Sequence, residues 1–164
     1  ARAMLAVSSN NSTTQALIGK LGGIPPLVSL IKSGTLEAQE HSACALWHLA
    51  SLRENRVLIK EANGIAPIVS LLICEGKLAP QLSSMLLMRL AEGSTRAALS
   101  IADAAGIVPL VRLLTSGTIA TQQMAAAALA AALAASSAAK RADRDPDPLA
   151  NMTLTFCSMS DMTT

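Results

Sequence analysis

The chain has 164 residues, of which 51% are hydrophobic but only 1% are aromatic, and its formal net charge is +2. So small a net charge, carried by scattered Lys and Arg residues, does not indicate nucleic acid or an anionic membrane as the partner. A core that must be built from Leu, Ile, Val, Met and Ala favours packed helices over a β-sheet.

The three cysteines, Cys44, Cys74 and Cys157, are odd in number and far apart, which predicts neither a disulfide framework nor a zinc site. We therefore expect reduced thiols in a cytoplasmic protein, with the nucleus as the other compartment. The longest apolar run, Met124 to Ala135, is shorter than the roughly 20 residues that cross a bilayer, so no membrane span is expected.

One 14-residue pattern occurs three times. "GGIPPLVSLIKSGT" starts at Gly22, "NGIAPIVSLLICEG" at Asn63 and "AGIVPLVRLLTSGT" at Ala105, so the copies are 41 and 42 residues apart. A period of this size is typical of solenoids built from two-helix or three-helix repeats. The first and third copies match at nine positions: Gly23/Gly106, Ile24/Ile107, Pro26/Pro109, Leu27/Leu110, Val28/Val111, Leu30/Leu113, Ser33/Ser116, Gly34/Gly117 and Thr35/Thr118.

Residues 1–22 lie before the first predicted repeat, and they begin without a methionine or a signal peptide. Because "ARAMLAVSSN" has the pattern of a helix interior, we expect this segment to be the end of a preceding repeat and the chain to be part of a longer protein. Such an uncapped end would expose Leu5, Leu17 and Ile18 and permit self-association.

Each copy divides into a short helix, a second helix and a long third helix. The second helix has proline in its first turn, is expected to bury Leu27, Leu30 and Ile31, and stops at Gly34. The third begins after Thr35 as its N-cap. Its buried stripe is expected to be Ala43, Leu46, Leu49 and Ala50.

The short helix of the next copy, "RENRVLIKEA", ends at Asn63-Gly64, where we expect Gly64 to take the left-handed cap conformation. The sequence thus predicts an all-α structure with helices near residues 12–20, 24–33, 35–51, 54–62, 65–74, 78–92, 95–104, 107–115 and 118–138. The predicted repeats are 23–63, 64–105 and an incomplete 106–140, followed by residues 141–164, whose two Asp-Pro pairs predict a disordered tail.

The pattern G-[IV]-x-P-[LI]-V-x-L-[LI], a glycine turn and "AQEHSACALWHLA" resemble the armadillo repeat over roughly residues 1–136. This resemblance implies a right-handed α-solenoid, or superhelix, of about three three-helix repeats, whose third helices line a concave groove. It also implies a protein-binding scaffold, because armadillo proteins typically hold extended segments of partner proteins in that groove.

Peptide-binding armadillo grooves often carry an Asn near the end of the third helix and a Trp four residues earlier. Alignment of "ALWHLA" with the family pattern places His48 at the Asn position and Cys44 at the Trp position. The next copy has Arg89 and Met85 at these positions and the third has Ala131 and Ala127, so a classical nuclear-import receptor is not expected. Trp47 stands beside His48 and not at the Trp position, and both packing between repeats and a partner-binding hot spot at the groove edge remain open for it.

Positions that share a register in the third helices form rows along the expected groove. The candidate partner-binding residues are His41, Cys44, His48, Leu82, Met85, Arg89 and Met124. They make an apolar, Met-containing strip with cationic or titratable side chains along one margin, and the alternative is that the Met residues only pack between repeats.

Catalysis is not expected. His41, Cys44 and His48 share one helix face, but no Cys, His or acid of the neighbouring third helix stands at a position that would complete a metal site, and nothing indicates an oxyanion hole. No phosphate-binding, dinucleotide-binding or hydrolase motif occurs, and no cofactor is predicted. The expected function is a non-enzymatic interaction scaffold; the alternative is the substrate-recognition arm of a ubiquitin-ligase-type protein whose catalytic domain lies outside this chain.

Overall fold

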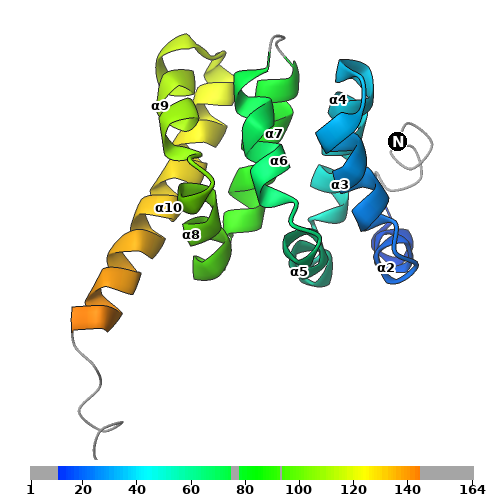
Figure 1. Cartoon of the computed structure of the whole chain (residues 1–164), viewed down its shortest axis with the longest axis horizontal. Coiled ribbons are helices and arrows are strands. Elements are labelled where there is room, and N and C mark those ends of the chain that lie inside the picture. Colours follow the sequence, from blue (N-terminus) through cyan, green and yellow to red (C-terminus); the bar gives the residue numbers. More distant parts are fainter. Residues whose placement is uncertain (1–10, 75–77, 93, 145–164) are drawn as a thin grey trace, which may run out of the picture.

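The computed structural model describes residues 11–74, 78–92 and 94–144. Within these ranges the chain is helical, without strands, and its helices form three side-by-side groups (Figure 1). Grouped by layer (Figure 1), the first repeat contains α2 (Ser12–Lys20), α3 (Ile24–Ser33) and α4 (Leu36–Leu49); the second contains α5 (Arg53–Glu61), α6 (Ile65–Ser70), the 3-10 helix η1 (Leu71–Ile73) and α7 (Leu78–Ala91); the third contains α8 (Thr95–Asp103), α9 (Ile107–Ser116) and α10 (Ile119–Arg144). This grouping starts each repeat at its short helix, whereas the predicted boundaries 23–63, 64–105 and 106–140 assign residues 12–20 to a preceding repeat.

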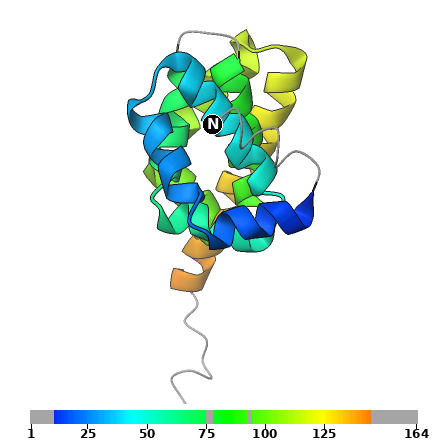
Figure 2. The same cartoon turned by 90° about the vertical axis from the view of Figure 1, so that its right-hand side faces the viewer.

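The groups are successive layers of one stack. The short helices α2, α5 and α8 follow one edge of the molecule in Figure 1, and a view along the stack shows the layers one behind another (Figure 2). Helix α4 packs against α7, and α7 packs against α10. The third helices therefore lie side by side, as the repeat period predicts.

Two helices differ from the sequence-based prediction. The second helix of the second repeat tightens to a 3-10 turn over Leu71–Ile73, and α10 runs to Arg144 rather than ending near residue 138. Helix α10 can continue to Arg144 because the first proline after its start is Pro146, and a proline disfavours the helical conformation only at the residue before it and beyond. Residues 141–144, expected to open a disordered tail, are thus helical, and the rest of that tail lies outside the described residues.

The turn before each second helix corrects one prediction. The left-handed residue is not Gly64, whose φ is −76°, but its predecessor Asn63, with φ of 53°. The equivalent residues are Gly22, with φ of 75°, and Ala105, with φ of 59°. Gly64 is required for space instead, because a Cβ there would lie 2.9 Å from the carbonyl oxygen of Ile59.

A continuous apolar core joins the three repeats. The predicted stripe of α4 is confirmed, since Ala43, Leu46, Leu49 and Ala50 are fully buried. Leu30, however, is 36% exposed. The equivalent Leu71 and Leu113, each of which follows a preceding repeat, are only 1% and 9% exposed. Leu17 is 54% exposed, whereas Ile18 is half-buried against the core and Leu5 lies outside the described residues.

The last helix changes the prediction about membrane spans. By length and composition, Ile119–Ala139 is long and apolar enough to cross a membrane, with a mean hydropathy of 1.3, although the uninterrupted apolar run within it is short. The bent pair Thr95–Asp103 and Ile107–Ser116 also passes when taken together. In this fold α10 packs against α7, α8 and α9, and its residues Ala125, Ala128 and Ala132 are fully buried.

Ala105 is an alanine in a left-handed conformation, which costs an L-residue roughly 1–2 kcal/mol. We expect Ala105→Gly to raise the free energy of unfolding by about 1 kcal/mol after allowance for the greater freedom of glycine in the unfolded chain. Urea denaturation measures this. The matched control is Ala104→Gly, where φ is −77° and glycine should be destabilising; equal losses in both variants would contradict the prediction.

Candidate protein-binding groove

The seven residues predicted to bind a partner all lie on the three third helices. We call them the third-helix strip: His41, Cys44 and His48 on α4, Leu82, Met85 and Arg89 on α7, and Met124 on α10. Each side chain is half-buried. In the armadillo fold the third helices line the concave side, and half-buried side chains suit the lining of an open groove.

Local sequence fixes where α4 begins and how its first histidine is held. Gly34 ends α3, and Thr35 caps α4 through its hydroxyl, which accepts a hydrogen bond from the Ala38 amide at 3.3 Å. One turn later, Nδ1 of His41 donates to the Glu37 carbonyl oxygen at 2.6 Å. The His41 ring is thereby tied to its own helix.

An aromatic and cationic cluster crosses the seam between the first two repeats. The guanidinium carbon of Arg89 on α7 lies 5.0 Å from the ring centroid of Trp47 on α4, within cation–π range. Trp47 also meets His48 edge to face, with ring centroids 4.6 Å apart. Trp47 therefore packs between repeats, which is one of the two interpretations left open by the sequence. A partner-binding role for Trp47 at the groove edge stays a prediction.

The sequence patterns did not predict the Trp47–Arg89 contact, because Arg89 was aligned with His48 and Trp47 was aligned with no residue of the next repeat. The signal was present in the period: position 88 is level with 47, so the residue after it can reach across the seam. Two donors in the cluster, Nε1 of Trp47 and Nε of Arg89, are buried without a hydrogen-bond partner. The part of the chain that the structure describes also contains no carboxylate paired with Arg89.

Burial and the nearby charge of Arg89 both lower the pKa of His48 from its usual value. Desolvation is the larger cause, and each cause disfavours the imidazolium form. At neutral pH the charge in this cluster thus belongs to Arg89, while His48 is a neutral hydrogen-bonding group.

Cys44 has the opposite character to a catalytic cysteine. Burial raises the pKa of its thiol, so the thiol stays protonated at neutral pH, whereas a nucleophilic cysteine needs a stabilised thiolate. Across residues 11–74, 78–92 and 94–144, no group of three or more His, Cys, Asp or Glu residues is placed to hold a metal ion.

The lowered pKa of His48 predicts a pH-dependent stability. The unfolded chain binds the imidazole proton of His48 more tightly than the folded chain does. The contribution of neutral His48 to the free energy of unfolding is therefore present above the unfolded pKa near 6.5 and is lost as the pH falls through the lower folded pKa. Urea denaturation measures the free energy of unfolding at about pH 7.5 and about pH 5.5. The drop in this free energy between the two pH values should be smaller for His48→Gln than for the wild type. An undiminished drop in His48→Gln would contradict the assignment.

Comparison with known families and structures identifies the fold. Residues 10–51, which include α2 to α4, match the family model described as armadillo/beta-catenin-like repeat. No curated protein sequence matches the chain significantly.

Several solved structures are similar to the chain. An engineered protein solved by the Northeast Structural Genomics Consortium is 30% identical, with 81% of this chain and 54% of that chain covered and a TM-score of 0.75. Computationally designed armadillo repeat proteins for modular peptide recognition match at 22% identity, 79% and 55% coverage and a TM-score of 0.75. A designed armadillo repeat protein in complex with the peptide (KR)4 matches at 22% identity, 79% and 55% coverage and a TM-score of 0.73.

The chain spans about half the length of these three matches. The repeat period, the three stacked layers, the family match and the structural similarity agree. The chain is a right-handed α-solenoid of about three three-helix repeats with the fold of designed armadillo repeat proteins, and its residues 10–51 match an armadillo/beta-catenin-like repeat.

Proposed function

We propose that the chain is a non-enzymatic scaffold that holds an extended or helical segment of a partner protein against the third-helix strip. The observation that carries this proposal is Arg89, whose guanidinium is held over Trp47 beside an apolar strip, with no carboxylate partner among the described residues. A fixed cation next to apolar surface is suited to a ligand that presents both an anion and an apolar side chain.

The chemistry of the strip specifies the segment further. Leu82 and Met85 provide half-buried apolar surface for an anchoring side chain, and Met adapts its shape readily to different ligands. A carboxylate on the segment would pair with Arg89 through a charge-assisted hydrogen bond. Because His48 is neutral at pH 7, it adds hydrogen-bonding capacity there without adding charge.

The similar solved structures support a peptide-binding role. One of these matches is described as computationally designed armadillo repeat proteins for modular peptide recognition, and another designed armadillo repeat protein is in complex with the basic peptide (KR)4. The third-helix strip contains Arg89 and two histidines and no acidic residue, so the segment proposed here is acidic rather than basic.

The same groove would serve the alternative role, in which the chain is the substrate-recognition arm of a ubiquitin-ligase-type protein. We place the protein in the cytoplasm, where Cys44 and Cys74 would stay reduced.

Self-association through the ends of the stack is a second part of the proposal. Val28 and Val69 are 3% and 5% exposed because the next repeat covers them, but the equivalent Val111 is 46% exposed. Leu133 is 55% exposed, whereas the equivalent Ala50 and Ala91 are buried. The face of the third repeat thus has the apolar character of an internal seam and suits the opposite end of a second copy.

Arg89→Glu tests the groove. We expect it to weaken binding of a captured partner by roughly 1 to 3 kcal/mol, because it removes a charge-assisted contact and adds repulsion. Titration of the partner, followed by the fluorescence of Trp47, the one tryptophan in the chain, measures the loss at the strip itself.

The matched control is Lys32→Glu, the same charge reversal at an exposed position in the last turn of α3. Circular dichroism should show unchanged helical content for both variants. Equal losses in the two variants, or no loss for Arg89→Glu, would place the binding surface elsewhere.

Sedimentation velocity over a range of concentrations tests self-association. The wild type should sediment faster as concentration rises, and Leu133→Glu should reduce this dependence because a charge would be buried unpaired at the contact. Val57→Glu, which adds the same charge at a 40% exposed position inside the stack, should behave as the wild type. A wild type that stays monomeric over the whole concentration range would contradict the proposal of self-association.

A further inference from the structure

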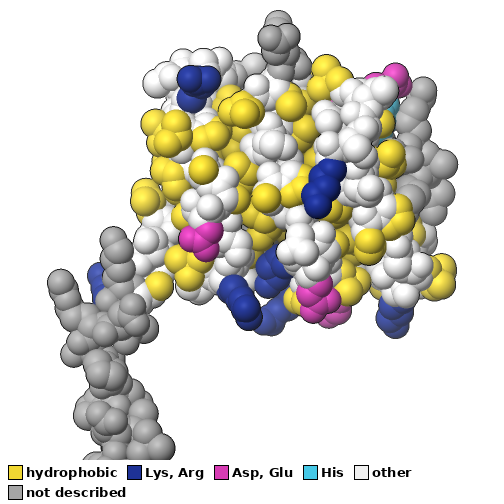
Figure 3. Space-filling view, in the orientation of Figure 1, with side chains coloured by type: hydrophobic (Ala, Val, Ile, Leu, Met, Phe, Trp, Pro, Cys, Tyr) yellow, Lys and Arg dark blue, Asp and Glu magenta, His cyan; other side chains and the backbone are white. Residues whose placement is uncertain are grey.

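A second candidate binding site lies away from the third-helix strip, at the seam between the second and third repeats. A cavity of about 610 Å³ opens between α5, α6 and α8, a size typical of small-molecule sites. Its lining residues are Val57, Lys60, Glu61, Asn63, Ile65, Ala66, Arg96, Ser100, Asp103 and Ala104. Figure 3 shows basic side chains gathered in the hollow between α5 and α8.

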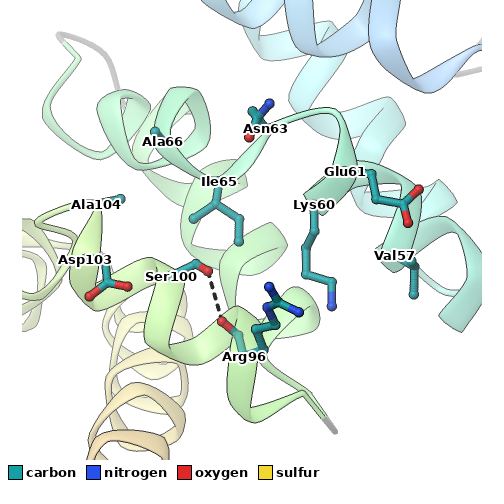
Figure 4. A pocket seen from close by; sticks show the side chains of 10 residues that line it. All are labelled: Val57, Lys60, Glu61, Asn63, Ile65, Ala66, Arg96, Ser100, Asp103 and Ala104. Carbon is teal, nitrogen blue, oxygen red and sulfur yellow. Dashed lines mark hydrogen bonds between the residues drawn. The ribbon is translucent and has the colours of Figure 1, made fainter.

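Two cations from different repeats share the middle of this cavity. Figure 4 shows Lys60 of α5 and Arg96 of α8 pointing toward the same space, while the carboxylates of Glu61 and Asp103 lie at opposite sides and point away. Across the described residues no ion pair neutralises either cation. The two like charges therefore produce a positive electrostatic potential in the space between them, and a bound anion would lower it.

The start of α8 strengthens this field. The ammonium of Lys60 donates a hydrogen bond to the hydroxyl of Ser94 at 3.3 Å, and Ser94 is the N-cap of α8. Lys60 is thereby held beside the positive end of the helix, and Arg96 stands in the first turn of the same helix. Ile65, Ala66 and Ala104 complete an apolar wall next to the cations.

The first seam provides an internal comparison. The equivalent cavity there is about 260 Å³ and is lined by Gly19, Gly22, Ile24, Pro25, Leu58, Glu61 and Ala62. Its seven lining residues correspond, after one repeat period, to seven residues of the larger cavity. The cavity itself is thus a product of the repeat geometry, but its size and its cations are specific to the second seam.

The cause of the difference is visible in the residues. At the first seam, Gly19 stands where Lys60 does, and any Cβ at Gly19 would overlap the Asn55 side-chain oxygen. At the second seam Ala97 takes the place of Asn55, which leaves room for a long side chain at position 60. Arg96 likewise replaces Glu54, so an acidic position becomes basic.

We propose that this cavity binds a small organic phosphate monoester, with the phosphate between Lys60 and Arg96 and its organic group against the apolar wall around Ile65. A phosphate offers several acceptor oxygens to two donors that approach from different repeats, and Arg and Lys are its usual partners. The rim carboxylates of Glu61 and Asp103 disfavour a ligand whose negative charge is spread over its whole length.

Isothermal titration calorimetry with phenyl phosphate on the full chain tests the proposal. We expect saturable binding, tighter than that of inorganic phosphate or phenylacetate, and weaker at high salt because the contacts are partly exposed. Arg96→Gln and Lys60→Gln should each weaken it about tenfold, the loss of one charge-assisted contact.

Arg53→Gln is the matched control, because Arg53 is an exposed cation on α5 outside the cavity lining. It should bind as the wild type, and so should Arg89→Glu, which separates this site from the third-helix strip. The proposal is overturned if phenyl phosphate shows no saturable binding, or if Arg53→Gln loses as much affinity as Arg96→Gln. Tighter binding of a phosphoserine peptide than of phenyl phosphate would overturn the assignment to a small molecule.

Discussion

The architecture depends on a close approach between a valine of one repeat and the hinge glycine of the next. A Cβ at Gly64 would lie 3.2 Å from a methyl carbon of Val28, and a Cβ at Gly106 would lie 3.3 Å from the matching carbon of Val69. At both glycines a carbonyl oxygen of the short helix lies closer still. Any larger residue would push the second helix off the preceding repeat, so the glycine sets the spacing at which the layers stack.

This spacing also creates both candidate sites. The distance between layers determines that Arg89 reaches Trp47 across the first seam, and it leaves a gap between α5 and α8 at the second. Neither site belongs to a single repeat, because each takes its important side chains from two layers. A variant that loosens a hinge glycine should therefore disturb both sites without altering any residue in them.

Sequence patterns predicted the fold closely because every repeat boundary is marked by residues with a definite backbone role. Prolines in the first turn of α3 and Thr35 at the cap of α4 can be recognised without a structure. The role of Gly64 could not, since a glycine needed for lack of a Cβ and a glycine needed for positive φ look alike in a sequence. Leu30 was misassigned because burial at the end of a stack depends on a neighbour that no local pattern describes.

The sites were harder to predict because repeats share their fold but not their surface chemistry. A periodic alignment correctly places the third-helix strip on α4, α7 and α10, but it compares residues within rows and so overlooks a contact between rows such as Trp47 with Arg89. The seam cavity was missed for a related reason, since Lys60 and Arg96 look like ordinary surface charges in single repeats. They become distinctive only when Gly19 and Glu54 are seen at the equivalent places of a cavity with the same geometry. Because the stack requires neither cation, their presence at one seam points to a ligand rather than to the fold.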